Sequence, residues 1–364
     1  MKLLRVFQLI LSLGMFVGMG AISRGLGEEL TVAGLSRPIL VQVPGNYDPG
    51  EVWPVMYFWP GPNGVATTRT VTPACEKRDW IIVGMTFTER ELLQVTRERM
   101  AAEVAALRRV RPLVEEAYSV DPGRVFVGGY FTGGWVAAEA LSDDATLAGA
   151  LLIGSGFLDH QALPVQQAVR GKPVYVGVGS VYTNHLMGLR AVKRFRGAGA
   201  QVTWDAWDFL GKAVPKDFED YPGMRQWLRL YSGKERGEGF REVAQAWGRE
   251  RLLEIGSIPH SGERYVAMKR FVEQPFLAVF GAGAVAAVEE QMAAFAKSDP
   301  EAAREAELWR QYEVLLQLEL RDRSRSSLER CLADYEEIMA NGEGSVTARL
   351  AEAEHARLSK VLGR

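Results

Sequence analysis

A glycine-rich segment over residues 121–134, DPGRVFVGGYFTGG, is the part of the chain whose spacing could most directly build a reactive site. The apolar run Val125–Val127 predicts a buried strand, and the glycines at 128, 129, 133 and 134 let the chain turn sharply from that strand into a helix. Such a turn can present a nucleophile or, with other spacing, cradle a phosphate. Metal chemistry finds no support, because the sequence has no HExxH motif, no close Cys or His pair and no calcium-type acidic loop.

The same segment resembles the nucleophile elbow of exported α/β-hydrolase esterases, and more narrowly that of the polyhydroxybutyrate-depolymerase and feruloyl-esterase-like group. In that group a DPxRV lead-in, a buried strand and GxSxGG follow one another. This chain keeps every element except the serine, whose position is taken by Phe131. A phenyl ring has no lone pair for attack on a carbonyl, so covalent acyl transfer cannot begin there. The neighbouring Thr132 is no substitute, because an elbow points only its apex side chain at the substrate.

The two other catalytic positions implied by the resemblance are also changed. The family places an acid after a later strand in a GxxDxN stretch, and here residues 179–184 are GSVYTN, with Tyr182 at the acid position. It places a histidine after the last strand, where residues 211–215 are GKAVP, with Lys212 at that position. His185 is the histidine nearest along the chain, and we expect it to begin a helix in a solvated or capping role. We therefore predict a degenerate triad and no catalytic residues.

A remodelled pocket is the expected result of these changes. The loop PGPNG over residues 60–64 stands where an oxyanion loop would be, and Gly61, Asn63 and Thr132 could still offer backbone amides there. The pocket is expected to be lined by Gly61, Asn63, Tyr130, Phe131, Thr132, Tyr182 and Lys212. An aromatic floor beside one cation suits a small organic acid, an ester or a carbohydrate. Trp204, Trp207 and Phe209 could extend it, although strand alternation alone would bury two of these three.

An enzyme with relocated chemistry is the alternative. Ser155 or Ser180 could act as the nucleophile if Lys212 served as its base in a Ser–Lys arrangement. That lysine would have to be buried enough to lose its proton at working pH. No cofactor is expected, because an elbow accounts for the glycines better than a nucleotide fingerprint does.

The elements that position these residues alternate between short apolar strands and helical stretches, which predicts an α/β fold with a doubly wound, mostly parallel sheet. Strands are expected at Leu30–Ala33, Ile39–Val43, Val55–Trp59, Ile81–Met85, Val125–Gly128, Ala150–Ile153, Val174–Val178 and Val202–Trp207. The longest helical stretch runs from about Leu92 to Tyr118, and Pro112 is expected to kink or split it.

The chain changes character after about Ser232, where strand patterns disappear. Leu328, Leu332, Tyr335 and Met339 follow one another at helical spacing, which predicts an amphipathic helix followed by a second one after a turn at residues 341–342. Residues 1–23 have the basic start, apolar stretch and small-residue end of a secretory signal peptide. We therefore expect a signal peptide at 1–23, an α/β-hydrolase-like domain at 24–232 and an all-helical domain at 233–364.

Export would place the protein in the periplasm or outside the cell, where disulfides persist. Cys75 and Cys331 are the two cysteines, and either a bridge between them or two buried thiols fits the sequence. The 43 basic and 45 acidic residues are mixed along the chain, which argues against a nucleic-acid partner. A protein partner bound through the C-terminal helices remains open. The leading interpretation is an exported, inactive esterase-like protein with a binding or scaffold role.

Overall fold

The computed structural model describes residues 27–92, 94–158, 161, 164–211, 214, 222–233, 238–274 and 282–364. The predicted signal peptide and Lys212 lie outside these residues. Both cysteines are buried and free of disulfides, so the two-thiol alternative holds in the structure. Within the described part of the chain, no helix combines the length and apolar character needed to cross a bilayer.

One eight-stranded sheet runs through the first part of the described chain, with the strand order β1-β2-β4-β3-β5-β6-β7-β8. The strands are β1 (Glu28–Leu30), β2 (Ile39–Gln42), β3 (Trp53–Trp59), β4 (Ile81–Gly84), β5 (Val120–Tyr130), β6 (Gly149–Ile153), β7 (Pro173–Gly179) and β8 (Gln201–Trp207). The first two strands pair antiparallel, and β3 to β8 are parallel. The predicted mostly parallel sheet is confirmed, with boundaries shifted by a few residues.

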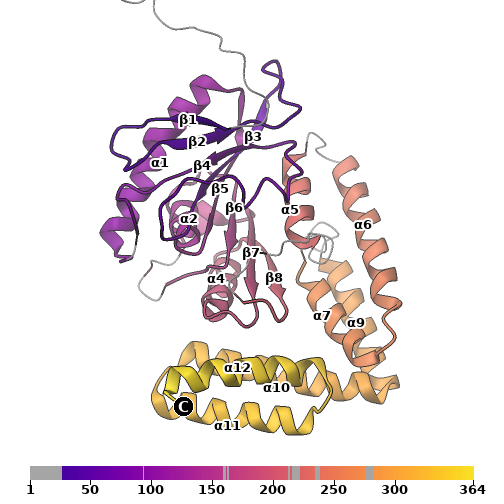
Figure 1. The fold of residues 1–364 in the computed structure, drawn as a ribbon. Helices are drawn as coiled ribbons and strands as arrows, with labels where there is room; N and C mark the ends of the chain where they lie inside the picture. The colour runs from indigo at the N-terminus through magenta and orange to yellow at the C-terminus, as the bar shows by residue number, and fades with distance from the viewer. Residues whose placement is uncertain are drawn as a thin grey trace, which may run out of the picture.

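Helices cover both faces of this sheet (Figure 1). They are α1 (Arg97–Ala117), α2 (Thr132–Asp143), α3 (Gln166–Val169), α4 (His185–Gly197) and α5 (Pro222–Ser232). Successive side chains of β3 alternate between two cores, since Tyr57 packs with α1 and α2 while Phe58 packs with α5. The prediction of a kink or break at Pro112 is wrong, because α1 is one helix. Pro112 and Arg108 are exposed, so the carbonyl that lacks its helical partner can be hydrated.

The C-terminal region is all helical, as predicted, and packs along the β7–β8 side of the sheet (Figure 1). Its helices are α6 (Glu238–Gly256), α7 (Ser261–Val272), α9 (Ala282–Ser298), α10 (Pro300–Arg321), α11 (Arg325–Asn341) and α12 (Val346–Leu362). The starts of α10, α11 and α12 are capped by the side chains of Asp299, Ser324 and Ser345. The three helices share a core that includes Leu328, Leu332 and Tyr335.

Candidate functional site

The turn between β5 and α2 is an elbow with Phe131 at its apex. Phe131 has φ 52° and ψ −113°, a backbone conformation that only glycine adopts without strain. Its amide donates a hydrogen bond of 2.9 Å to the carbonyl of Ile153, and its carbonyl accepts one of 3.0 Å from Gly134. The chain therefore leaves the carboxyl end of a central strand and enters a helix through one strained residue, as in a nucleophile elbow.

The glycines of the motif are required by close backbone approach. A Cβ atom on Gly129 would lie 2.2 Å from the carbonyl carbon of Gly133, and one on Gly133 would lie 2.4 Å from the carbonyl oxygen of Trp59. A Cβ on Gly134 would lie 2.4 Å from the Cβ of Ser155. Each distance is far below van der Waals contact, so a larger residue would force the elbow apart.

Aromatic rings gather around the apex. The ring of Phe131 lies 5.1 Å from that of Trp135 and 6.3 Å from that of Tyr182, centroid to centroid. Tyr182 is in the loop after β7, as predicted, and is 8% exposed. The Tyr130 ring lies against Gly61 and Gly154, since a Cβ on either glycine would be 3.4 or 3.2 Å from a ring carbon. Four of the predicted pocket residues, Gly61, Tyr130, Phe131 and Tyr182, are thus brought together.

The remaining predicted pocket residues are placed differently. Thr132 is 1% exposed at the first position of α2, so its hydroxyl is covered. Asn63 is exposed in a turn, where its carbonyl accepts a hydrogen bond from Arg37 and its side chain accepts one from the amide of Val65. Lys212 lies outside the described residues.

The chemistry of this cluster is that of neutral aromatic groups. Burial raises the pKa of the Tyr182 phenol well above its usual range, and Tyr130 adds to that shift. Burial likewise raises the pKa of Tyr130. Both phenols are therefore neutral near pH 7, and neither supplies the charge with which a carboxylate orients and stabilises a catalytic histidine. The cluster can pack against an apolar group or exchange a hydrogen bond with a ligand.

The two serines considered as relocated nucleophiles are both buried. Ser155 has no exposed surface, and within the described residues its hydroxyl has no hydrogen-bond partner. Ser180 is 1% exposed, and its Oγ accepts a hydrogen bond of 2.9 Å from the amide of Phe209. A substrate carbonyl could reach neither hydroxyl without movement of the surrounding chain.

His185 begins α4 as expected, but the expectation of a solvated role is wrong. It is 2% exposed and its ring lies 5.4 Å from that of Trp204. Burial lowers the pKa of this histidine to about 3, with Arg270 and Arg357 as further cationic causes. The helical region covers it, and that contact could not be read from the local sequence. The imidazole is therefore neutral near pH 7, and it lines a cavity that it shares with Trp204 and Trp309 rather than the edge of the sheet that carries Phe131.

Comparison with known proteins gives matches among solved structures only. No protein-family model and no curated protein matches the chain. A carboxylesterase from Mesorhizobium loti aligns at 15% identity over 55% of this chain and 98% of its own, with a TM-score of 0.45. A Bacillus cereus carboxylesterase aligns at 16% identity over 53% and 93%, with a TM-score of 0.44. An esterase from the planctomycete Thermogutta terrifontis aligns at 15% identity over 59% and 96%, with a TM-score of 0.42.

The elbow itself, together with the parallel sheet at whose carboxyl edge it lies, decides the fold. The first part of the chain has the α/β-hydrolase fold. In this hydrolase-fold domain, the loops after β3, β6 and β7 meet around the rings of Tyr130 and Phe131, so aromatic side chains occupy this edge of the sheet.

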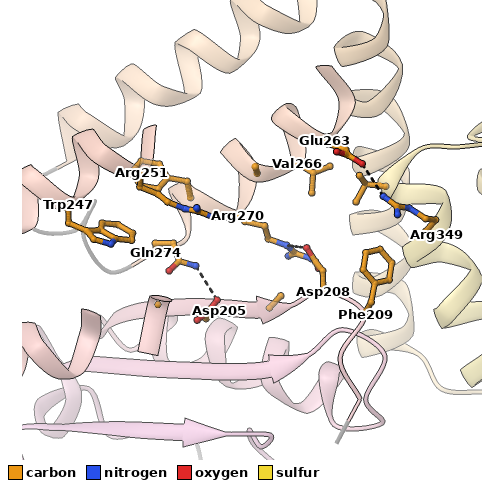
Figure 2. Close-up of a pocket in the computed structure, with 15 residues that line it drawn as sticks. Asp205, Asp208, Phe209, Trp247, Arg251, Glu263, Val266, Arg270, Gln274 and Arg349 are labelled. Carbon is orange, nitrogen blue, oxygen red and sulfur yellow. Dashed lines mark hydrogen bonds and ion pairs between the residues drawn. The ribbon is translucent and has the colours of Figure 1, made fainter. Parts of the chain in front are cut away.

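A second site, which the sequence did not reveal, is a cavity of about 380 Å³ between the end of β8 and helices α6, α7 and α12 (Figure 2). Asp205 of β8 accepts hydrogen bonds from Tyr175 and Gln274, at 2.5 and 3.2 Å. Asp208 holds Arg270 of α7 through contacts of 2.5 and 3.3 Å. The one available signal was Asp205 itself, a carboxylate in the middle of an apolar strand.

Proposed function

We propose that this chain is a catalytically inactive α/β-hydrolase that acts as a binding or scaffold protein. The observation that carries the proposal is Phe131, which occupies the strained apex of the elbow and places a phenyl ring where a nucleophile would stand. Strained conformations are kept where the surrounding structure enforces them, and here the close contacts of Gly129 and Gly133 do so.

The acid position and the buried serines support the same proposal. Tyr182 is a neutral phenol in the loop that would carry the acid, so it cannot hold a histidine as a carboxylate does. Ser155 and Ser180, the candidates for a relocated nucleophile, lie beneath the surface. Activity through either serine would require both a change of conformation and a deprotonated Lys212.

The proposed place of action is outside the cytoplasm, in the periplasm or the extracellular space. This rests on residues 1–23, whose basic start, apolar stretch and small-residue end are typical of a cleaved signal peptide. The helices after residue 233 are the proposed contact region for a protein partner, because they form a separate layer beside the hydrolase-fold domain, with a core that Leu186 of α4 joins. Detection of the mature chain in a periplasmic or culture-medium fraction would test the location.

The experiment that tests the function is ester hydrolysis by the purified mature chain, beginning at Arg24. Short acyl and feruloyl esters serve as substrates, a fluorophosphonate probe reports any activated serine, and an active serine esterase is the positive control. We expect no turnover and no labelling. Turnover that is lost in Lys212→Ala, and that is also lost in either Ser155→Ala or Ser180→Ala, would refute the proposal and establish a relocated dyad.

A further inference from the structure

The cavity in Figure 2 is built by both parts of the chain. Its floor is the end of β8 with Asp205, Asp208 and Phe209, its roof is α6 and α7, and Arg349 of α12 closes one end. The volume of about 380 Å³ is that of a small-molecule pocket, and the position between two domains at the carboxyl ends of strands is where such pockets occur.

Most charges on the lining are already neutralised by one another. Asp208 is paired with Arg270 at 2.5 Å, and Glu263 with Arg349 at 3.5 Å. Asp205 accepts hydrogen bonds from Tyr175 and Gln274, and burial raises the pKa of its carboxyl group.

Among the cavity residues that the structure describes, Arg251 of α6 is the cation that takes no part in these pairs across the cavity. Figure 2 shows its side chain reaching from α6 toward Arg270, across the cavity. Its partner is Glu254 on the same helix, at 2.6 Å, and the two side chains are 36% and 55% exposed. A solvent-exposed pair of this kind contributes little free energy, so a second carboxylate can share or replace it.

Aromatic rings stand at both ends of the cavity. The Trp247 ring stacks on that of Phe271, with centroids 5.9 Å apart and planes inclined by 26°. At the other end Phe209 is 44% exposed, and the guanidinium of Arg349 lies 5.3 Å from its ring centre. The backbone of Phe209 is strained, with a φ of 61°. Either ring could pack against an apolar or aromatic group of a ligand.

We propose that this cavity binds a small organic carboxylate with an aromatic ring, its carboxylate held by Arg251 and its ring packed against Trp247. Guanidinium groups bind carboxylates through paired, charge-assisted hydrogen bonds, and partial burial strengthens them. The inference rests on the proposed binding function and places that function at the domain boundary, away from Phe131.

Isothermal titration of the full mature chain with phenylacetate tests the proposal. Phenylacetamide has nearly the same shape without the charge, and acetate has the charge without the ring. Phenylacetate is expected to bind about tenfold or more tightly than either, because each lacks one of the two contacts. Equal affinity for phenylacetate and phenylacetamide would overturn the role of Arg251, and equal affinity for acetate would overturn the role of the ring.

Arg251→Gln gives the matched variant and Arg249→Gln its control, since Arg249 is exposed on the same helix and does not line the cavity. We expect phenylacetate affinity to fall about tenfold or more in the first variant and to stay unchanged in the second. The same affinity in both variants would overturn the proposal. If the chain neither binds phenylacetate nor hydrolyses esters, the cavity proposal alone is overturned. If the chain hydrolyses esters, the proposed function on which the cavity proposal rests is overturned.

Discussion

Replacing Arg357 by methionine should destabilise the C-terminal helices more than any exposed substitution in them. Arg357 of α12 is 8% exposed and lies between Glu319 of α10 and Glu354 of α12, whose side chains have no exposed surface. Its Nε donates to Glu354 at 2.5 Å, and its Nη2 donates to Glu319. One guanidinium therefore links two helices through two buried carboxylates.

The expected loss is about 3–5 kcal/mol of unfolding free energy, the usual cost of removing one partner from a buried ion pair. The cost arises because the carboxylates keep their desolvation penalty and lose their counter-ion. Within the described residues, one oxygen of Glu319 and one of Glu354 already lack hydrogen-bond partners, so no second contact takes over.

Hydrogen exchange of α10 and α12 amides is the appropriate measurement, because a chain with two domains need not unfold in one step. The control is Arg325→Met, which removes an exposed pair with Glu329 at 3.2 Å and should cost less than about 0.5 kcal/mol. A loss below about 1 kcal/mol in Arg357→Met, or one equal to that of the control, would refute the reasoning. Adding Glu319→Gln and Glu354→Gln should restore much of the stability, since no uncompensated charge then remains.

Further outcomes follow from other contacts. Burial raises the pKa of Glu354 from 4.5 to about 7, so the folded chain binds more protons than the unfolded chain between these pH values. The stability of α10–α12 should therefore fall as pH rises from 4.5 to about 7. Urea unfolding at a series of pH values should show this fall, and the fall should be smaller in Glu354→Gln. Phe131→Ser alone should give no ester hydrolysis, because a serine at the apex would still face Tyr182; measurable turnover would show that a base is present. Arg270→Lys should loosen the contact between α7 and the β8 loop by about 1–3 kcal/mol, because lysine cannot make both contacts to Asp208, and unchanged exchange of the α7 amides would contradict this. The mass of the intact chain should be the same before and after reduction, since Cys75 and Cys331 are free; a gain of two hydrogen atoms on reduction would indicate a bridge.

Much of the hydrolase-fold domain could be predicted from local pattern. Runs such as Val125–Val127 are apolar because parallel strands are buried on both faces, and each of the eight predicted strands overlaps an observed one. The elbow was predictable because its glycines recur at a fixed local spacing, although Gly133 and Gly134 make their close contacts with Trp59 and Ser155, which are distant in sequence. The break expected at Pro112 was wrong, since an exposed carbonyl can be hydrated without ending the helix.

The sequence by itself determined the strained turn, the identity of its apex residue and the division into a sheet-containing part and a helical part. Each of these depends on residues that are neighbours along the chain. Only the tertiary structure decided that His185 is buried, that Asp208 binds Arg270 and that a cavity lies between β8 and α7. Those features join residues tens of positions apart, and charge pairing and desolvation depend on which surfaces meet, which no local pattern encodes.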